Sequence, residues 1–212
     1  MKPPLNPDRF YHVYNHANGR ENLFENSGNY SYFLKRYTHF IHAIADTYAY
    51  CLMPNHFHFA IKIKSLKEIV KVIRMQQSSK GLKPLDDCDI NNDLISKFLS
   101  RQFANLFNGY AQAFNKQQNR MGSLFIPNFS RKLVDSDEYL KTLIHYIHLN
   151  PVHHRFVYDF TRWKHSSYLT FLSTLPTEIM RDEVIMMFGG RKGFIAYHQR
   201  GIDRNMISDL EG

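Results

Sequence analysis

The sequence predicts a mixed α+β fold, in which an antiparallel sheet carries helices on one face and a helical C-terminal extension follows. Short runs of aromatic and β-branched residues alternate along the chain with longer stretches whose apolar residues recur at helical spacing. The composition is that of an ordinary globular protein, since 43% of the 212 residues are hydrophobic and 22% are charged. We expect one main domain over residues 1–165 and the extension over residues 166–212.

The first two expected elements are a strand and a helix. Residues 10–16 are aromatic and β-branched and precede an Asn-Gly turn pair, a pattern that predicts a strand. Over residues 31–44 the apolar side chains recur at helical spacing, and Ser27 or Asn29 is available as the N-terminal cap. The chain is therefore expected to begin with a strand and a helix.

The next two elements form a predicted hairpin. The strand-like runs 47–53 and 56–64 are separated only by Pro54 and Asn55, which suits a tight turn. In the second run the phenylalanines and isoleucines alternate with histidines, an alanine and lysines. Successive side chains of a strand point to opposite faces, so we expect one face in the core and one polar face free for a ligand.

The middle of the chain is expected to be helical with one interruption. Apolar periodicity predicts helices over residues 66–75 and 94–118. Between them, residues 78–92 have the glycine, proline and aspartate content of a loop insertion. A short strand is expected at residues 131–134.

A further helix is predicted over residues 135–150. Asp135 and Glu138 have the spacing of a capping box, and Pro151 should end the helix because it disfavours the α conformation in the residue before it. Two or three short helices should follow residue 166, one of them closed by a Gly-Gly pair. The order strand, helix, strand, strand, helix, strand, helix indicates a ferredoxin-like, or RRM-like, sheet.

The charge balance makes a polyanion the first partner to test. The 27 lysines and arginines exceed the 19 aspartates and glutamates by eight, and the pI is about 9.4. The two cysteines, Cys51 and Cys88, exclude a disulfide framework and a four-cysteine zinc module. No stretch approaches the roughly 18 apolar residues that cross a bilayer, and the N-terminus lacks the apolar region of a signal peptide. We therefore expect a cytoplasmic protein without a membrane partner.

Two histidines on the predicted polar face are candidate metal ligands. His56 and His58 lie two residues apart on a strand, so their Cα atoms are roughly 6.5 to 7 Å apart and both imidazoles project from the same face. One metal ion can bridge that separation. The alternative is that both are ordinary polar residues of a solvated strand face, and a third ligand would decide between the two interpretations.

The helix over residues 135–150 offers further candidates. Tyr146 and Asn150 lie four residues apart and therefore on the same side of the helix. An amide oxygen can bind a divalent ion beside imidazoles, and a phenol can be a nucleophile toward phosphorus. Tyr146 can equally be an amphipathic core tyrosine, and Tyr139, seven residues earlier on the same face, is the rival nucleophile.

Three segments resemble, in order and spacing, the single-tyrosine transposases of the His-hydrophobic-His (HUH) superfamily. They read FYHVYNHANGRENLFEN, YCLMPNHFHFAIK and GSLFIPNFSRKLVDSDEYLKTLIHYIHLNPVHHRFV. The most specific elements are MPNHFHF and HYIHLNP, and the Tyr-Ile-x-x-Asn-Pro ending is similar to the REP-associated branch of this family. The resemblance covers roughly residues 9–168 and implies a ferredoxin-like catalytic domain.

This resemblance implies a site and a reaction. His56, His58 and Asn150 would bind a divalent metal, Mg²⁺ or Mn²⁺, and Tyr146 would be the nucleophile. The implied enzyme is a DNA transposase and single-strand endonuclease that cuts and rejoins single-stranded DNA near hairpins through a 5′-phosphotyrosine link. Its partner would be single-stranded or hairpin DNA at the nucleoid, and it would act as a monomer or homodimer.

Several side chains near these residues are candidate DNA contacts, although each cation can equally be a solvated surface charge. They are Tyr14, Lys62, Lys64, Lys67, Lys71, Arg74, Arg131 and Lys132. Together the cations would form a phosphate track, while Tyr14 and its neighbour Tyr11 would either stack on bases or pack in the core. Two other functions stay open: a non-catalytic RRM-like nucleic-acid-binding protein, and a metal-dependent hydrolase in which water attacks and Tyr146 only positions the substrate.

Overall fold

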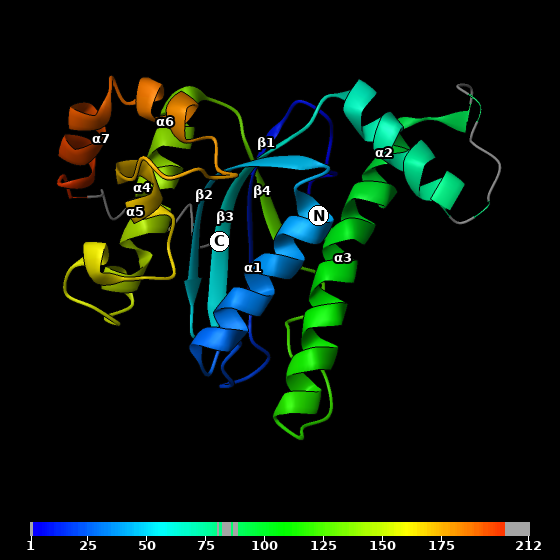
Figure 1. Cartoon of the computed structure of the whole chain (residues 1–212), viewed down its shortest axis with the longest axis horizontal. Coiled ribbons are helices and arrows are strands. Elements are labelled where there is room, and N and C mark those ends of the chain that lie inside the picture. Colours follow the sequence, from blue (N-terminus) through cyan, green and yellow to red (C-terminus); the bar gives the residue numbers. More distant parts are fainter. Residues whose placement is uncertain (1, 80, 82–85, 87–88, 202–212) are drawn as a thin grey trace.

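The centre of the protein is a four-stranded antiparallel sheet. The computed structural model describes residues 2–79, 81, 86 and 89–201. The strands are β1 (Phe10–His16), β2 (Ala45–Met53), β3 (His56–Ile63) and β4 (Ser130–Val134). They pair in the order β2-β3-β1-β4, with every neighbouring pair antiparallel (Figure 1). This confirms the predicted mixed fold built on an antiparallel sheet.

Helices follow the strands in the expected order. They are α1 (Ser27–Ile41), α2 (Leu66–Ser79), α3 (Asn92–Gln117), α4 (Asp137–His153), a 3-10 helix η2 (Phe160–Arg162), α5 (Tyr168–Leu172), α6 (Arg181–Met187) and α7 (Arg191–His198). The first helix begins earlier than periodicity predicts because Asn26 caps it: its side chain accepts a hydrogen bond from the Asn29 backbone at 3.2 Å. Asn29 completes the capping box rather than capping the helix itself.

One face of the sheet packs against α1 and α3. The Phe57 ring of β3 lies 5.2 Å from the Phe33 ring of α1 and 5.5 Å from the Phe107 ring of α3. Phe59 lies on the same face, stacked 4.2 Å from Tyr37. The predicted alternation of β3 is therefore confirmed on its apolar side.

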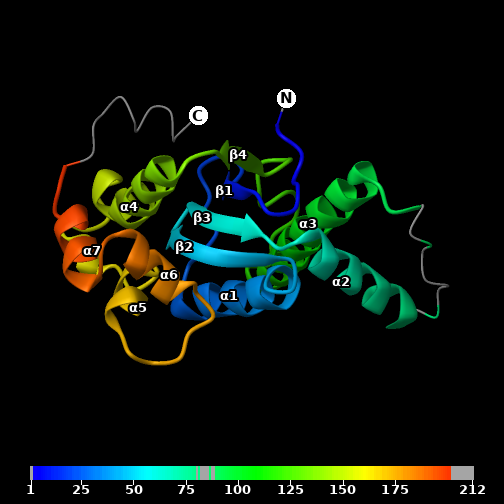
Figure 2. The ribbon, with the colours of Figure 1, turned by 90° about the horizontal axis from the view of Figure 1, so that it is seen from above.

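The other face of the sheet is covered as well, which corrects the prediction of helices on one face and an open polar face. An apolar cluster joins Cys51 and Ala60 of the sheet to Leu143 and Ile147 of α4. Figures 1 and 2 show α4 on the opposite side of the sheet from α1. The polar residues of β3 suggested a solvent-exposed face. Instead, α4 packs over these side chains and buries them, and buried polar side chains are tolerated where they have hydrogen-bond partners.

Helix α4 differs from the prediction at both ends. Ser136, not Asp135, is its cap, and its side chain accepts a hydrogen bond from the Tyr139 backbone at 3.3 Å. The helix also continues past Pro151, where an end was predicted, to His153. Proline removes one donor, but packing against the sheet holds the helix through this point, and tertiary packing supplies most helical stability.

The C-terminal helices pack onto α4. Tyr168 of α5, Val184 of α6 and Phe194 of α7 belong to the same apolar cluster as α4. The predicted Gly-Gly end of a helix is confirmed: Gly189 and Gly190 follow α6 with φ of +75° and +96°, a conformation that favours glycine. The division into units at residues 165 and 166 stays a prediction.

Part of the predicted insertion at residues 78–92 lies outside the described residues. Helix α2 extends to Ser79, and the side chain of Asn91 caps α3 by accepting a hydrogen bond from the Leu94 backbone at 2.9 Å. Residues 80, 82–85 and 87–88 between them are not described. Across the described residues, no helix combines the length and apolar character needed to cross a membrane.

Candidate active site

Strand β3 presents two histidines to α4. His56 and His58 lie on the face of β3 opposite Phe57 and Phe59, as the alternation predicts. Their side chains are buried, with exposed fractions of 1% and 3%. These imidazoles therefore form part of a closed layer between the sheet and α4, which contradicts the interpretation as polar residues on a wet face.

Helix α4 places Tyr146 and Asn150 against these histidines. The Tyr146 ring lies edge-on to the His58 ring, with 5.5 Å between the centroids. Asn150, one turn further along, is fully buried, and its side chain opposes the lowering of the pKa of His56. The structure thus brings together the two histidines, the tyrosine and the asparagine that the sequence analysis singled out. The rival Tyr139 lies two turns earlier and packs at the border of the apolar cluster of α4.

The continuation of α4 through Pro151 adds another histidine. The His154 backbone donates a hydrogen bond to the Asn150 carbonyl at 2.9 Å, so the last turn keeps its helical form. The His154 ring then lies edge-on to His56, with 4.5 Å between the ring centroids. An end of the helix at Asn150 would have directed this residue elsewhere.

Strand β1 supplies two histidines that the sequence analysis did not assign. Tyr14 pairs with His58 and His16 pairs with His56, so alternate residues of β1 share the histidine face of β3. His12 Nε2 lies 2.8 Å from His58 Nδ1 in a buried hydrogen bond, and the His16 ring stacks on His56 at 4.6 Å. In the sequence HVYNH, alternation already places His12, Tyr14 and His16 on one face of β1. That this face is the one carrying His56 and His58 follows only from the pairing of β1 with β3.

Burial keeps these imidazoles neutral. It lowers the pKa of His12 to about 3, with a smaller contribution from the charge of Lys132. Burial and the neighbouring His154 and His16 lower the pKa of His56 to about 3, and burial with His12 and other imidazoles holds the pKa of His58 well below its ordinary value. At neutral pH these three rings are therefore uncharged, and each carries one nitrogen lone pair.

The donor atoms suit a divalent cation. Within the described residues, His56 Nε2 and both amide atoms of Asn150 are buried and make no hydrogen bond of ordinary geometry, although Asn150 lies close enough to His56 to raise its pKa. When His58 Nδ1 donates the hydrogen bond to His12 Nε2, the lone pair of His58 Nε2 is left for a ligand. No group of three His, Cys, Asp or Glu side chains among the described residues has metal-site geometry, so a third ligand would have to come from another residue type. Two imidazoles and an amide oxygen are a donor set that fits.

The structure separates the cations that were expected to form one track. Lys132 of β4 pairs with His12 and lies on the histidine face, whereas the next-door Arg131 pairs with Val13 on the other face. Arg131 Nε donates a hydrogen bond to the Pro3 carbonyl at 2.5 Å. Only Lys132 of these two can therefore serve the histidine site directly.

The two lysines of β3 lie further from the site. The ammonium group of Lys62 is 5.3 Å from the centroid of the Phe10 ring, and Lys64 Nζ is 3.5 Å from an oxygen of Asp46. At about 3.3 Å per residue, Lys62 is roughly 13 Å along the strand from His58. These lysines are therefore not first neighbours of the candidate metal site.

The remaining candidate DNA contacts are also set apart. Lys67, Lys71 and Arg74 lie on α2, which Figures 1 and 2 show at the opposite end of the molecule from α4. Tyr14 is buried beside His12 and His58, with ring centroids 4.7 and 5.6 Å away. The role of Tyr14 as a DNA contact stays a prediction. Its neighbour Tyr11 is buried on the other face of the sheet.

Comparison with known proteins gives a fold likeness. The chain matches no protein-family model and no curated protein. Among solved structures it is similar to "Structure of the REP associates tyrosine transposase bound to a REP hairpin", with a TM-score of 0.53 and 14% sequence identity over 83% of this chain and 87% of that chain. At this identity the likeness shows that the two chains share a fold.

Proposed function

We propose that this protein is a metal-dependent DNA strand transferase and single-strand endonuclease with Tyr146 as the nucleophile. One observation carries the proposal: Tyr146 and Asn150 of α4 lie on the same buried face as His56 and His58 of β3. A phenol beside uncharged imidazole and amide groups that can bind a metal ion is an arrangement suited to covalent phosphoryl transfer. The fold shared with a REP-associated tyrosine transposase supports it.

The proposed ligands are His56 Nε2, His58 Nε2 and the amide oxygen of Asn150. A bound Mg²⁺ or Mn²⁺ would polarise the scissile phosphate and neutralise its developing charge. His12 would keep His58 in the tautomer that binds, because a proton on His58 Nδ1 can be donated to His12 Nε2, 2.8 Å away. Lys132, on the same face, would attract the phosphate backbone.

In the proposed reaction the Tyr146 oxygen attacks phosphorus. The bond between phosphorus and the 3′ oxygen breaks, a 5′-phosphotyrosine link forms, and the phenol loses the proton that the departing 3′-hydroxyl gains. Attack by the same or another 3′-hydroxyl reverses the step and rejoins DNA without a nucleotide cofactor. Since Tyr146 is only 2% exposed, entry of a phosphate requires a shift of α4 or of the segments that cover it.

The RRM-like alternative is disfavoured by one feature of the fold. An RRM-like protein stacks bases on an open sheet face. Here α1 and α3 cover one face, and α4 covers the other. The hydrolase alternative predicts cleavage without a covalent protein–DNA product, so detection of such a product distinguishes the two reactions.

The experiment is adduct formation with labelled hairpin DNA and Mn²⁺. We expect a protein–DNA adduct that survives denaturing electrophoresis, persists in Tyr139→Phe and is lost in Tyr146→Phe. Survival of the adduct in Tyr146→Phe would show that another residue is the nucleophile. Cleavage by the wild type with no adduct would instead favour attack by water.

A further inference from the structure

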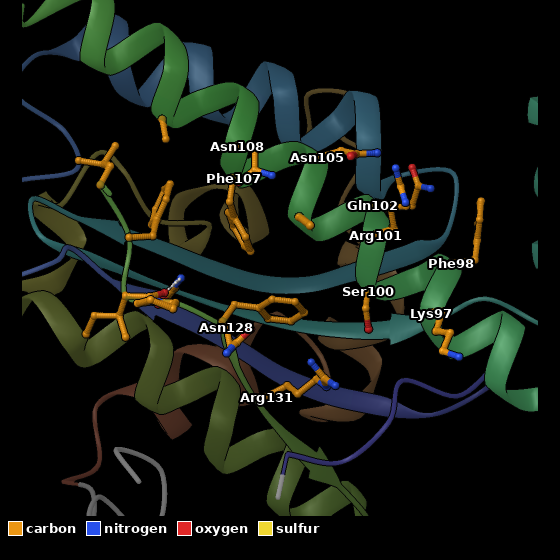
Figure 3. A pocket seen from close by; sticks show the side chains of 18 of the residues that line it. Lys97, Phe98, Ser100, Arg101, Gln102, Asn105, Phe107, Asn108, Asn128 and Arg131 are labelled. Carbon is orange, nitrogen blue, oxygen red and sulfur yellow. Dashed lines mark hydrogen bonds between the residues drawn. The ribbon is translucent and has the colours of Figure 1, made fainter. Parts of the chain in front are cut away.

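A long groove runs beside α3, on the side of the sheet away from α4. It has a volume of about 1410 Å³ and is bounded by α3 and by the segment that leads into β4. Figure 3 shows labelled side chains of α3 on one side of it and Asn128 and Arg131 on the other. The lining residues of α3 extend from Leu94 to Asn115, a span of about 30 Å at 1.5 Å per residue. A space of this length suits a chain molecule better than a small metabolite.

The groove is basic. Arg101, Lys97 and Arg131 line it, and none of the described lining residues is an aspartate or glutamate. Lys97 is partly neutralised by Asp93, 2.6 Å away in the first turn of α3. Arg131 is half-buried, its guanidinium lies 5.1 Å from the Phe129 ring centroid, and burial lowers its pKa. A half-buried guanidinium in a groove without carboxylates favours an anionic ligand.

Amide side chains supply the rest of the polar lining. Asn105, Asn108 and Gln112 of α3 belong to it, and Asn128 belongs to the opposite wall. Each amide both donates and accepts hydrogen bonds, so such a lining can pair with the edges of unpaired bases as well as with phosphates. An acidic peptide also offers backbone donors and acceptors to these amides, so poly-glutamate is the competitor that distinguishes the two polymers.

The groove also continues toward the candidate active site. Strand β4 is at the edge of the sheet, and its consecutive residues Arg131 and Lys132 face the groove and the histidine layer respectively. The extended N-terminal segment adds Lys2, whose charge interacts with that of Arg131 and whose Nζ donates a hydrogen bond to the Phe129 carbonyl at 3.0 Å. A basic path therefore passes round the β4 edge from one face of the sheet to the other.

We propose that this groove binds single-stranded nucleic acid at a second site, distinct from the strand that Tyr146 would cut. Phosphates would contact Arg101 and Arg131, and unpaired bases would contact the amides of α3. The inference rests on the proposed function only in taking DNA as the polymer. It is carried by the length, charge and amide lining of the groove, none of which involves the histidine layer.

The test measures binding of a fluorescent oligo-deoxythymidine in EDTA, where no metal-dependent chemistry takes place. Arg101 and Asn108 are exposed positions of α3, so Arg101→Gln and Asn108→Asp should fold normally, which circular dichroism checks. We expect both variants to bind several-fold more weakly, and Arg101→Gln to reduce the slope of log affinity against log salt by about 0.7. Arg162→Gln is the matched control, because it changes the net charge equally at an exposed position of η2, which packs with α4.

Three results would overturn the groove proposal. They are equal loss of affinity in Arg101→Gln and Arg162→Gln, competition by poly-glutamate as effective as that by unlabelled strand, and tighter binding of a blunt duplex than of the single strand. The Tyr146 adduct assay separates this outcome from the fate of the proposed function. If the wild type forms the adduct but Arg101→Gln binds oligo-deoxythymidine as tightly as the wild type, only the groove proposal is removed. If Arg101→Gln binds it more weakly but the wild type forms no adduct, only the proposed reaction is removed.

Discussion

His12 of β1 and His58 of β3 share a buried hydrogen bond, with 2.8 Å between His12 Nε2 and His58 Nδ1. Both rings are neutral at pH 7, because burial lowers the pKa of His12 to about 3 and that of His58 well below its ordinary value. If His58 donates, its Nε2 keeps a lone pair for a metal; if His12 donates, the proton of His58 sits on Nε2 and blocks it. The pairing of two strands thus bears directly on the ligand chemistry of His58.

The first prediction is that His12→Phe weakens Mn²⁺ binding by about tenfold or more, the usual effect of removing a partner of a metal ligand. His12→Gln should retain more affinity, since its amide oxygen can accept the proton of His58 Nδ1. Isothermal titration calorimetry measures both. His42→Gln, at an exposed histidine after α1, is the control. Equal Mn²⁺ affinity in His12→Phe and the wild type would remove the positioning role of His12.

The second prediction concerns Asn150, whose amide atoms are buried without hydrogen-bond partners among the described residues. An unsatisfied buried polar group costs about 1–3 kcal/mol, and leucine has a similar shape without that cost. We expect Asn150→Leu to raise the free energy of unfolding of the metal-free protein by about 1 kcal/mol and to abolish stabilisation by Mn²⁺. Urea unfolding with and without Mn²⁺ measures both effects.

A matched control for Asn150 is Asn29, which is also buried but is hydrogen-bonded to Gln117 at 2.6 Å and to the Glu25 backbone at 2.9 Å. Asn29→Leu should destabilise the protein. If Asn150→Leu destabilises the metal-free protein as much, its amide is satisfied in solution. If Mn²⁺ still stabilises Asn150→Leu, Asn150 is not a ligand.

The third prediction is a loss of stability in mild acid, and it concerns a second histidine pair. His198 Nδ1 is 2.8 Å from the Phe194 carbonyl, to which it must donate, so its Nε2 accepts from His148 Nδ1 at 2.8 Å. His148 Nε2 in turn accepts from the Ser167 hydroxyl at 2.8 Å. Protonation of His198 would put a second proton between the two rings and break this chain of hydrogen bonds.

Burial lowers the pKa of His198 to about 3, whereas an unfolded histidine titrates near 6.5. The unfolded state therefore binds more protons between these values, so the contribution to stability is complete above pH 6.5 and is lost as pH falls through this window. One such imidazole costs about 2 kcal/mol at pH 5. Urea unfolding should show a smaller loss between pH 7.5 and pH 5 in His198→Phe than in the wild type. Equal losses would mean that His198 is protonated in the folded protein or that other groups dominate.

Much of the fold was accessible to sequence reasoning because its signals are local. The alternation of β3 and the periodicity of α3 each follow from side-chain direction within one element. The placement of α4 was not accessible in this way. The histidines of β3 made its second face look solvated, and Pro151 looked like a helix end, because both judgements ignored what packs against these residues.

The candidate site shows the same division. The sequence predicts that His56 and His58 share a face, because both lie in one strand. It predicts the same for Tyr146 and Asn150, because both lie in one helix. His12 was missed because its partner is 46 residues away in sequence and is reached only through strand pairing. Likewise, strand alternation alone puts Arg131 and Lys132 on opposite faces, but which of the two shares the histidine face follows only from the register of β4.

The last prediction compares a lysine on the histidine face, Lys132, with a lysine on α2, Lys71; the sequence analysis places both in one phosphate track. Lys132 lies opposite His12 on the histidine face, whereas Lys71 lies on α2 at the far end of the molecule (Figures 1 and 2). Binding of hairpin DNA with a single-stranded arm should weaken several-fold in Lys132→Gln, and the slope of log affinity against log salt should fall by about 0.7 to 0.9, because one phosphate contact is lost.

The matched variant Lys71→Gln removes the same charge and should leave both the affinity and the salt slope close to those of the wild type. Fluorescence anisotropy at several salt concentrations gives both quantities. Equal effects of the two substitutions would mean that DNA responds to net charge rather than to the histidine face, since long-range attraction does not depend on which lysine is removed. A larger effect of Lys71→Gln than of Lys132→Gln would place the phosphate track on α2 instead of on the histidine face.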